Sequence, residues 1–161
     1  MKLDIYVDGS YSKHKPDVVS GGIIIVDRDC NKPLYARRVY SKDKAFTSMN
    51  NVGGELVATV IGMTAAYSYS KVEEISSIRF FHDYIGIDKF ITGGWKAKAK
   101  GAVLYVHAFN SMRKDGLKDT DIRFVKVKAH SGNKYNELAD EVAKGNVPYE
   151  CRDIIREEYE F

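Results

Sequence analysis

Four acidic residues stand where a carboxylate is costly unless it has a partner. Asp8 closes the apolar segment IYV, and Asp83 follows the segment IRFFH. Glu55 comes directly after a Gly-Gly pair, and Asp140 lies inside an amphipathic segment beside apolar residues. A charge in such a place is unfavourable unless it is paired or binds a metal ion. The four acids therefore form a candidate metal site.

A cluster of four carboxylates predicts divalent-cation chemistry. Carboxylates at one place repel one another and cannot all stay ionised alone. Oxygen-only ligation favours Mg²⁺, with Mn²⁺ as a substitute, over zinc. Two such ions about 3.5–4 Å apart can activate a water and stabilise the leaving oxygen of a phosphodiester. Taken singly, the acids also have ordinary interpretations: Asp8 in a turn, Glu55 in a first helical turn, Asp83 as a helix cap and Asp140 as a solvated helix residue.

The apolar pattern predicts the elements that would bring these acids together. Alternating and β-branched segments predict strands, and apolar residues at helical spacing predict helices. The order of elements predicts an α/β fold, with a mixed five-stranded sheet, three antiparallel strands first, and helices packed on it. If the first and fourth strands are neighbours, Asp8 and Asp83 meet at one edge of the sheet. The expected strands are 3–9, 20–27, 34–41, 78–81 and 122–127, and the expected helices are 55–69, 85–92, 98–114 and 135–144.

Length and composition place the chain among single-domain globular proteins. It has 161 residues, of which 44% are hydrophobic, and this suits one core. No apolar run approaches the roughly 18 residues of a membrane span, and the acids in the first eight residues exclude a signal peptide. Cys30 and Cys151 lie far apart without metal-ligand spacing, which predicts free thiols in a reducing cytoplasm. We expect a cytoplasmic monomer.

The net charge of +3 is unevenly distributed. Residues 150–161 hold five acids and two bases, so residues 1–149 carry 23 bases against 17 acids. A moderately basic body is compatible with a polyanionic partner, but this charge alone does not identify one. We divide the chain into a domain at 1–146 and an acidic C-terminal tail at 147–161, and we expect the tail to form a short helix on the surface of the same domain.

Four segments, in order, resemble the type 1 ribonuclease H family. They are IYVDGSYS (5–12), NNVGGELVATVIGMTAA (50–66), FFHDYIGIDKFITGGWKAK (80–98) and VKAHSGNKYNELADEVAKG (127–145). The last segment is the most specific, because it places a His, an Asn-Glu pair and an Ala-Asp pair at fixed spacing. The resemblance implies a ribonuclease H-like fold. It also implies an endoribonuclease that hydrolyses the RNA strand of RNA–DNA hybrids with two Mg²⁺ ions, leaving 3′-hydroxyl and 5′-phosphate ends.

The resemblance also implies roles for individual residues. The four acids would bind the metal ions, and His130 would assist the attacking water or product release. Glu137, one helical turn before Asp140, would lie near the second metal. Each of these two residues has an ordinary alternative, an exposed loop histidine for His130 and a solvated helix acid for Glu137.

Substrate contacts are expected on both strands of the hybrid. The segment before Glu55 would contact the RNA 2′-hydroxyls, and its glycines would let the backbone approach the minor groove. Two aromatic residues and nearby lysines would contact the DNA strand, unless the aromatic residues only pack in the core. The expected substrate-binding residues are Gly9, Ser10, Asn50, Asn51, Gly53, Gly54, Phe90, Trp95, Lys96 and Lys98.

The sequence also departs from the best-known family members. The stretch from Asp83 to Trp95 is shorter, and the basic protrusion is reduced to 95–100. The chain is more similar to the subgroup that carries an N-terminal viroplasmin-like hybrid-binding module, although the 161 residues contain no such module and we expect a complete small protein. Two rival functions stay open. One is a DNA nuclease or resolvase of the same fold, and the other is a non-catalytic hybrid-binding module.

Overall fold

Three antiparallel strands form one half of the sheet. In the computed structural model, which describes residues 1–128 and 131–161, they are β1 (Lys2–Tyr11), β2 (Val19–Asp27) and β3 (Lys32–Ser41). β1 pairs with β2, and β2 pairs with β3, both antiparallel. The predicted antiparallel start of the sheet is confirmed, and each strand is slightly longer than its apolar pattern indicated.

The other half of the sheet runs parallel to β1. β4 (Ser77–His82) pairs with β1, and β5 (Asp121–Lys126) pairs with β4. Parallel strands end at the same edge of a sheet. Asp8, towards the end of β1, and Asp83, directly after β4, therefore lie at one edge. The condition on which the sequence would bring Asp8 and Asp83 together, that the first and fourth strands are neighbours, is therefore met.

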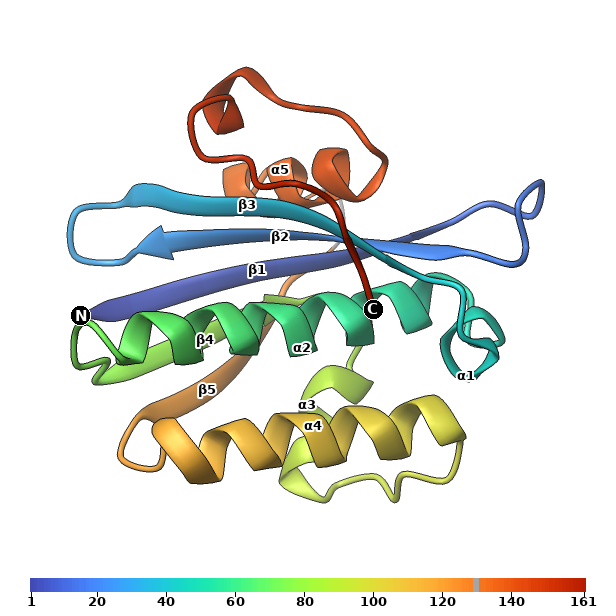
Figure 1. The fold of residues 1–161 in the computed structure, drawn as a ribbon, viewed down its shortest axis with the longest axis horizontal. Coiled ribbons are helices and arrows are strands. Elements are labelled where there is room, and N and C mark those ends of the chain that lie inside the picture. Colours follow the sequence, from blue (N-terminus) through green and yellow to red (C-terminus); the bar gives the residue numbers. More distant parts are fainter. Residues whose placement is uncertain (129–130) are drawn as a thin grey trace.

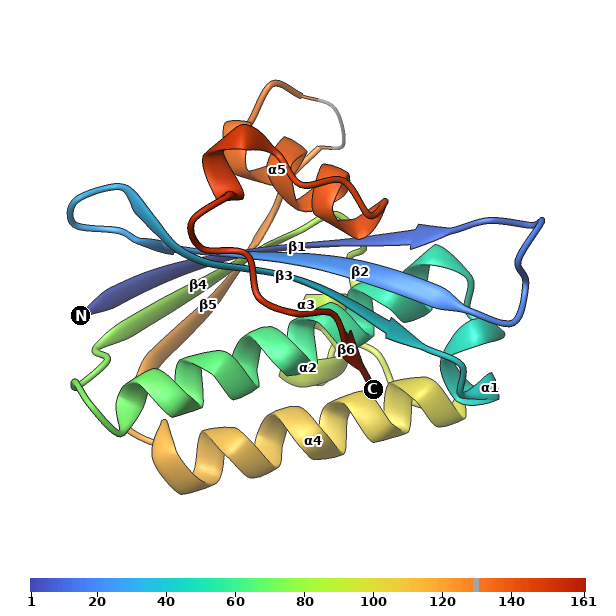
Figure 2. The same cartoon turned by 45° about the horizontal axis from the view of Figure 1, so that its top comes forward.

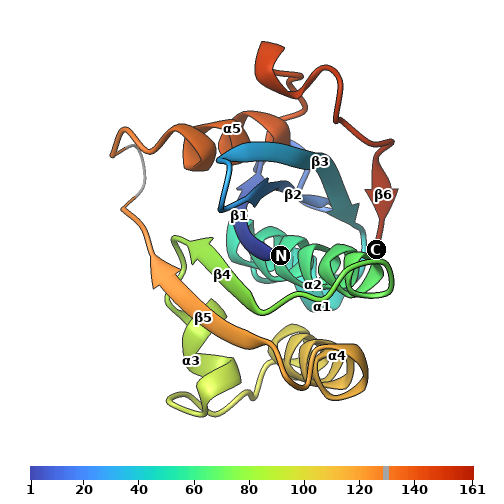
Figure 3. The same cartoon turned by 90° about the vertical axis from the view of Figure 1, so that its left-hand side faces the viewer.

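Helices cover both faces of this sheet (Figures 1 and 3). α2 (Asn51–Ser70) and α4 (Lys100–Gly116) lie on one face, with the short helices α1 (Lys44–Thr47) and α3 (Gly86–Thr92) beside them. α5 (Lys134–Ala143) lies on the other face. None of the helices in the described ranges is both long and apolar enough to cross a membrane.

The central strands are buried on both faces, which explains their continuous apolar runs. Ile23 and Ile25 of β2 belong to the core beneath α2 and α4, whereas Ile24 and Val26 belong to the core beneath α5. α5 lies very close to β2 at Gly22, where a side chain would collide with the backbone of Ala139 and Ala143. This close contact sets the position of Asp140, which follows Ala139 on the helix.

The C-terminal tail differs from its prediction. It forms only a short 3₁₀ turn, η1 (Tyr149–Cys151), and then a two-residue strand, β6 (Tyr159–Glu160), parallel to β3 (Figure 2). This three-residue turn stands where a short helix was expected, and the sheet has six strands, in the order β5-β4-β1-β2-β3-β6, instead of the predicted five. An edge strand such as β3 offers unpaired backbone groups, and the tail pairs with them.

Charge complementarity supports this pairing. Glu158 accepts a hydrogen bond from Nη1 of Arg38 at 3.1 Å, and Nε of Arg37 donates to the Glu157 carbonyl at 2.7 Å. Glu158 of the tail therefore forms an ion pair with Arg38 of β3, and Arg37 bonds the tail backbone. A sequence pattern read segment by segment contains no signal for this pairing, because the partners lie about 120 residues apart.

The boundaries of two helices also differ from prediction. α2 begins at Asn51, not Glu55, so the expected loop 50–54 is mostly the first turn of a helix. Gly53 and Gly54 are buried there, and a side chain on either would collide with the carbonyl group of Phe46 or Ser20. Tertiary packing thus overrides the low helix propensity of glycine. The helix predicted at 98–114 lies at Lys100–Gly116.

Substitution of Cys151 would show whether the C-terminal tail packs against the domain. Both cysteines are free thiols, but Cys151 is fully buried beside β3 whereas Cys30 is exposed. Burial also raises the pKa of the Cys151 thiol. We expect Cys151→Ser to lower the free energy of unfolding by about 1–3 kcal/mol in urea titrations, because a hydroxyl loses its hydration there. The matched variant Cys30→Ser should change it by less than about 0.5 kcal/mol. Equal effects of the two variants would contradict a packed tail.

Candidate active site

Three of the four predicted acids line one pocket at the edge where β1 and β4 end. The pocket has a volume of about 160 Å³. Its acids come from β1, from the residue after β4 and from α5, which are far apart in the sequence. The residues that line it are Asp8, Gly9, Asn51, Asp83, Asn136, Glu137 and Asp140.

Glu55, the fourth acid, lies buried behind the pocket and is only 4% exposed. Its Oε1 accepts a hydrogen bond from the backbone N–H of Asp83 at 2.9 Å, and its Oε2 accepts one from Tyr84 at 3.0 Å. Burial, together with the negative charge of Asp8, raises the pKa of Glu55 to about 8, although the two N–H groups act in the opposite direction. Glu55 is thus fixed in place by the turn after β4, but its negative charge lacks a cation.

Asp8 and Asp140 form the second half of the site. Asp8 accepts a hydrogen bond from the N–H of Gly9 at 2.9 Å. Burial, the neighbouring Asp140 carboxyl and the negative charge of Asp83 together raise the pKa of Asp8 to about 7, while the N–H of Gly9 acts in the opposite direction. Oδ2 of Asp140 also accepts from Nζ of Lys144 at 2.8 Å, one turn later on α5.

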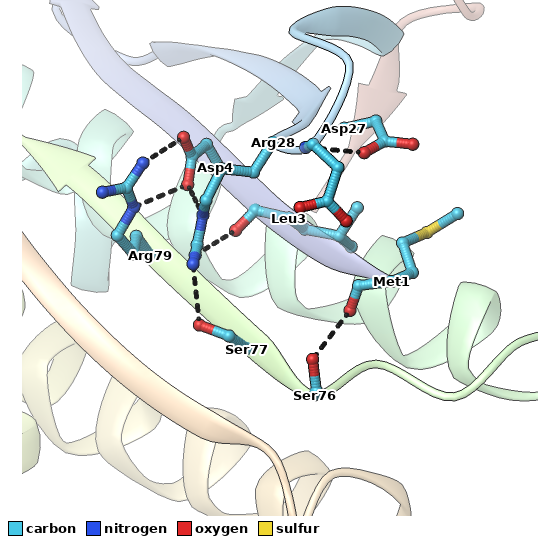
Figure 4. Close-up of polar contacts among 9 residues, drawn as sticks. Met1, Leu3, Asp4, Asp27, Arg28, Ser76, Ser77 and Arg79 are labelled. Atoms are coloured by element: carbon cyan, nitrogen blue, oxygen red, sulfur yellow. Dashed lines mark hydrogen bonds and ion pairs between the residues drawn. The ribbon is translucent and has the colours of Figure 1, made fainter.

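Among the residues that the structure describes, Asp8 lacks the basic partners that another acid of the same strand, Asp4, has. Residues two or four apart on a strand share a face, so Asp4 and Asp8 point to the same side of the sheet. Oδ1 of Asp4 accepts from Nε of Arg28 and Nε of Arg79, both at 2.8 Å, and Oδ2 accepts from Nη2 of Arg79 at 2.7 Å (Figure 4). Within residues 1–128 and 131–161, no basic side chain forms an ion pair with Asp8. Asp4 is therefore a satisfied structural acid, and Asp8 is not.

The donor set fits a hard divalent cation. All four candidates are carboxylates in a partly desolvated place, and the raised pKa values of Glu55 and Asp8 show that the negative charge there is uncompensated. In the part of the chain that the structure describes, no three Asp, Glu, His or Cys side chains already surround a point where a metal ion could sit. One of the four carboxylates, that of Asp140, is bonded to Nζ of Lys144 instead. A cation bound by Asp140 would take the place of this lysine.

The other expected site residues are partly assembled around this pocket. Glu137 is exposed and lines the pocket, as do Gly9 and Asn51. Asn50 is exposed next to Asn51 and has a left-handed backbone with φ of 57°. His130 lies outside the described residues. Gly53 and Gly54 were expected to let the backbone approach the minor groove, but both are buried and pack against the backbone of Phe46 and Ser20. Their contact with RNA stays a prediction.

An aromatic group lies on the side of β4, next to the turn that holds Glu55. The ring centroids of Phe90 and Trp95 are 5.7 Å apart, and that of Tyr84 lies 6.1 Å from Trp95. Trp95 is 41% exposed, whereas Phe90 is partly buried and packs against the core. Lys96 and Lys98 are exposed beyond it. Trp95 therefore offers a free ring face, and Phe90 supports it.

Two residues near the site, Asn136 and His82, were not among those expected from the sequence. Asn136 lines the pocket although it is 6% exposed. Its signal was present, because it precedes Asp140 by four residues and thus shares a face of α5. His82 is 1% exposed, directly before Asp83, and looked like an ordinary strand residue.

A protein-family model described as RNase H matches residues 1–147. The chain belongs to the ribonuclease H family. It is a type 1 ribonuclease H, so the sequence resemblance is confirmed, and its tail from 148 on lies outside the match. Enzymes of this family generally depend on divalent metal ions.

Individual relatives agree with this assignment. The ribonuclease H of Rhodospirillum rubrum is 31% identical over 149 residues, which cover 89% of this chain and 82% of the relative. That of Clostridium botulinum is 26% identical over 147 residues, covering 88% and 93%. The solved structure of LC11-RNase H1 in complex with an RNA/DNA hybrid has a TM-score of 0.72 at 17% identity, and covers 89% of this chain and 95% of that one. At that identity the last comparison supports the fold alone.

The raised pKa values predict how the stability of this ribonuclease H depends on pH. Glu55 and Asp8 in the metal-free fold bind protons up to about pH 8 and 7, but in the unfolded chain only up to about pH 4. Between these values the folded state holds more protons, so raising the pH through this window removes stability. In chelator, we expect the free energy of unfolding to fall from pH 5 to pH 8 by on the order of a few kcal/mol.

Urea titrations of the metal-free protein at several pH values measure this slope. Glu55→Gln should flatten it, because the amide does not titrate, whereas the exposed control Glu150→Gln should not. Stability that rises with pH over this window would contradict the uncompensated charge at the site.

Proposed function

We propose that this ribonuclease H hydrolyses the RNA strand of RNA–DNA hybrids, with two Mg²⁺ ions held by Asp8, Glu55, Asp83 and Asp140. The observation that carries the proposal is the pocket lined by three carboxylates, with Glu55 buried behind it and bonded to the Asp83–Tyr84 turn. Mn²⁺ is the expected substitute, since the donors are all oxygen atoms.

The chain's own groups would divide the work as follows. When bound, the two ions supply positive charge that activates a water and stabilises the leaving oxygen, giving 3′-hydroxyl and 5′-phosphate ends. Asp8, Asp83 and Asp140 would hold the ions through their carboxylate oxygens, and Asp140 would do so in place of its present bond to Lys144. Glu55 stays fixed by its two N–H donors and so orients Asp83. Glu137, which lines the pocket, would lie near the second ion, and His130 would assist the attacking water or product release.

The hybrid would lie across the pocket mouth. Asn51 lines the pocket and is exposed, so its amide can bond an RNA 2′-hydroxyl, which DNA lacks. The DNA strand would lie on the exposed face of Trp95, with Lys96 and Lys98 near its phosphates. The remaining expected contacts to the RNA strand are Gly9, Ser10, Asn50, Gly53 and Gly54. A monomer in the cytoplasm, without membrane attachment, stays our expectation.

Acid variants test the metal assignment. Asp8→Asn and Asp83→Asn should each reduce the rate of hybrid cleavage with Mg²⁺ by about 100-fold or more, because each removes a charge needed at the reacting phosphate. Asp29→Asn, in the exposed turn after β2, is the matched control and should retain wild-type activity. Wild-type rates in either site variant would make the assignment wrong.

The substrate panel separates the rival functions. The same assay with hybrid, double-stranded RNA and double-stranded DNA should give cleavage of the RNA strand of the hybrid only. Cleavage of DNA alone would favour a nuclease or resolvase of the same fold. Hybrid binding without cleavage under Mg²⁺ or Mn²⁺ would favour a non-catalytic module.

Trp95 tests the position of the DNA strand. Stacking on an aromatic ring contributes about 1–3 kcal/mol per base or sugar contact. Trp95→Ala should therefore raise KM for the hybrid by about tenfold while kcat at saturation changes little. Tyr149→Ala, which removes another exposed aromatic ring, in η1 far from Trp95 along the chain, is the control. Equal KM values for the two variants would place the DNA strand elsewhere.

A further inference from the structure

The turn that holds Glu55 is itself held by one buried side chain, His82. This histidine is the last residue of β4 and is 1% exposed. Its Nδ1 lies 2.9 Å from the carbonyl oxygen of Tyr84, two residues later. The carbonyl also accepts from the N–H of Ile87, at the start of α3, at 3.1 Å. His82 therefore closes the turn from one side, and α3 closes it from the other.

The protonation of the ring follows from its partner. A carbonyl oxygen can only accept, so Nδ1 carries the proton and donates it. Nε2 is buried and has no hydrogen-bond partner among residues 1–128 and 131–161. Only one edge of this ring, the Nδ1 edge, makes a polar bond in the described structure.

A buried ring that leaves one nitrogen unpaired costs stability, so a purely apolar residue would pack more favourably there. The ring does contact Phe124, with centroids 6.1 Å apart, and a phenylalanine could make that contact equally well. The Nδ1 bond is what distinguishes histidine from an apolar residue. It acts on the segment whose two N–H groups bind Glu55.

We propose that His82 is a positioning residue for the metal site. Its Nδ1–H fixes the Tyr84 carbonyl, and this aims the N–H groups of Asp83 and Tyr84 at the two oxygens of Glu55. The same bond sets the direction of the Asp83 side chain, which leaves the chain at the centre of this turn. His82 touches neither substrate nor ion. The inference rests on the proposed function, because it assumes that Glu55 and Asp83 bind the divalent cations.

The geometry of the ring supplies matched variants. Asparagine places an amide N–H near the position of Nδ1, glutamine places one near Nε2, and phenylalanine keeps the ring without any donor. His82→Asn should therefore keep the bond to the Tyr84 carbonyl, whereas His82→Gln and His82→Phe should lose it. A role in packing alone predicts the reverse order, with phenylalanine best and asparagine worst.

Metal binding is measured directly on the full chain. Mn²⁺ is added to the metal-free protein, and the free ion is followed by its electron paramagnetic resonance signal. Loss of an outer partner of a metal ligand typically weakens affinity by about 10–100-fold. We expect His82→Phe and His82→Gln to weaken Mn²⁺ binding by about tenfold or more, and His82→Asn to stay within about threefold of wild type. At saturating metal, KM for the hybrid should be unchanged.

Amide hydrogen exchange gives a second measurement that does not depend on metal. In His82→Phe the amides of Asp83 and Tyr84 should exchange faster while those of β1 and β2 keep their protection. General acceleration would mean loss of the fold and would overturn a local positioning role, as would wild-type Mn²⁺ affinity in His82→Phe or equally weak binding in His82→Asn. If the wild-type protein binds no Mn²⁺, the proposed function fails first and this inference falls with it.

Discussion

The buried carboxylate of Glu55 is the constraint on which the site depends. A carboxylate that is removed from water needs hydrogen-bond donors, a cation or a proton. Two N–H groups from the turn after β4 supply the donors, but burial still raises its pKa to about 8. In the described part of the chain, the carboxylate of Glu55 therefore still lacks a positive partner, and a divalent cation bound at the site would supply one. This requirement also explains why the turn, β4 and α2 must be placed accurately relative to one another.

Asp4 and Asp8 of β1 differ in the groups that compensate their negative charge. Asp4 is buried and has two arginines, so it stabilises the start of β1 against β2 and β4. Asp8, on the same face, accepts a hydrogen bond only from the N–H of Gly9 within the described residues, and its neighbours Asp140 and Asp83 are acids. Replacing the arginine partners of Asp4 would leave a buried carboxylate without an ion pair. Asp8 already has no ion pair in the described residues. An acid whose compensation is missing from the fold marks the place where a ligand belongs.

The sequence predicted the parts that depend on local pattern and strand order. Alternation located the strands, and the parallel placement of β1 and β4 then brought Asp8 and Asp83 together, while the family motif pointed to Glu55 and Asp140. Contacts distant in sequence were not predictable in this way. The β6 strand depends on Glu158 and Arg38, and the start of α2 depends on Gly54 packing against Ser20. His82 was missed because its pattern is that of any strand residue, and only the position of its Nδ1 reveals its role.

The acidic tail and the exposed lysines beside Trp95 lie in different parts of the fold. The acidic tail lies along β3, at the opposite edge of the sheet from β5, and its acids pair with bases there (Figure 3). Lys96 and Lys98, between α3 and α4, form no ion pair within the described ranges. Because exposed charges are screened over roughly 8–10 Å in physiological salt, the tail has little influence on these lysines. The tail therefore lowers the net charge of the chain without weakening the basic surface beside Trp95, and an overall charge of only +3 is compatible with binding a polyanion.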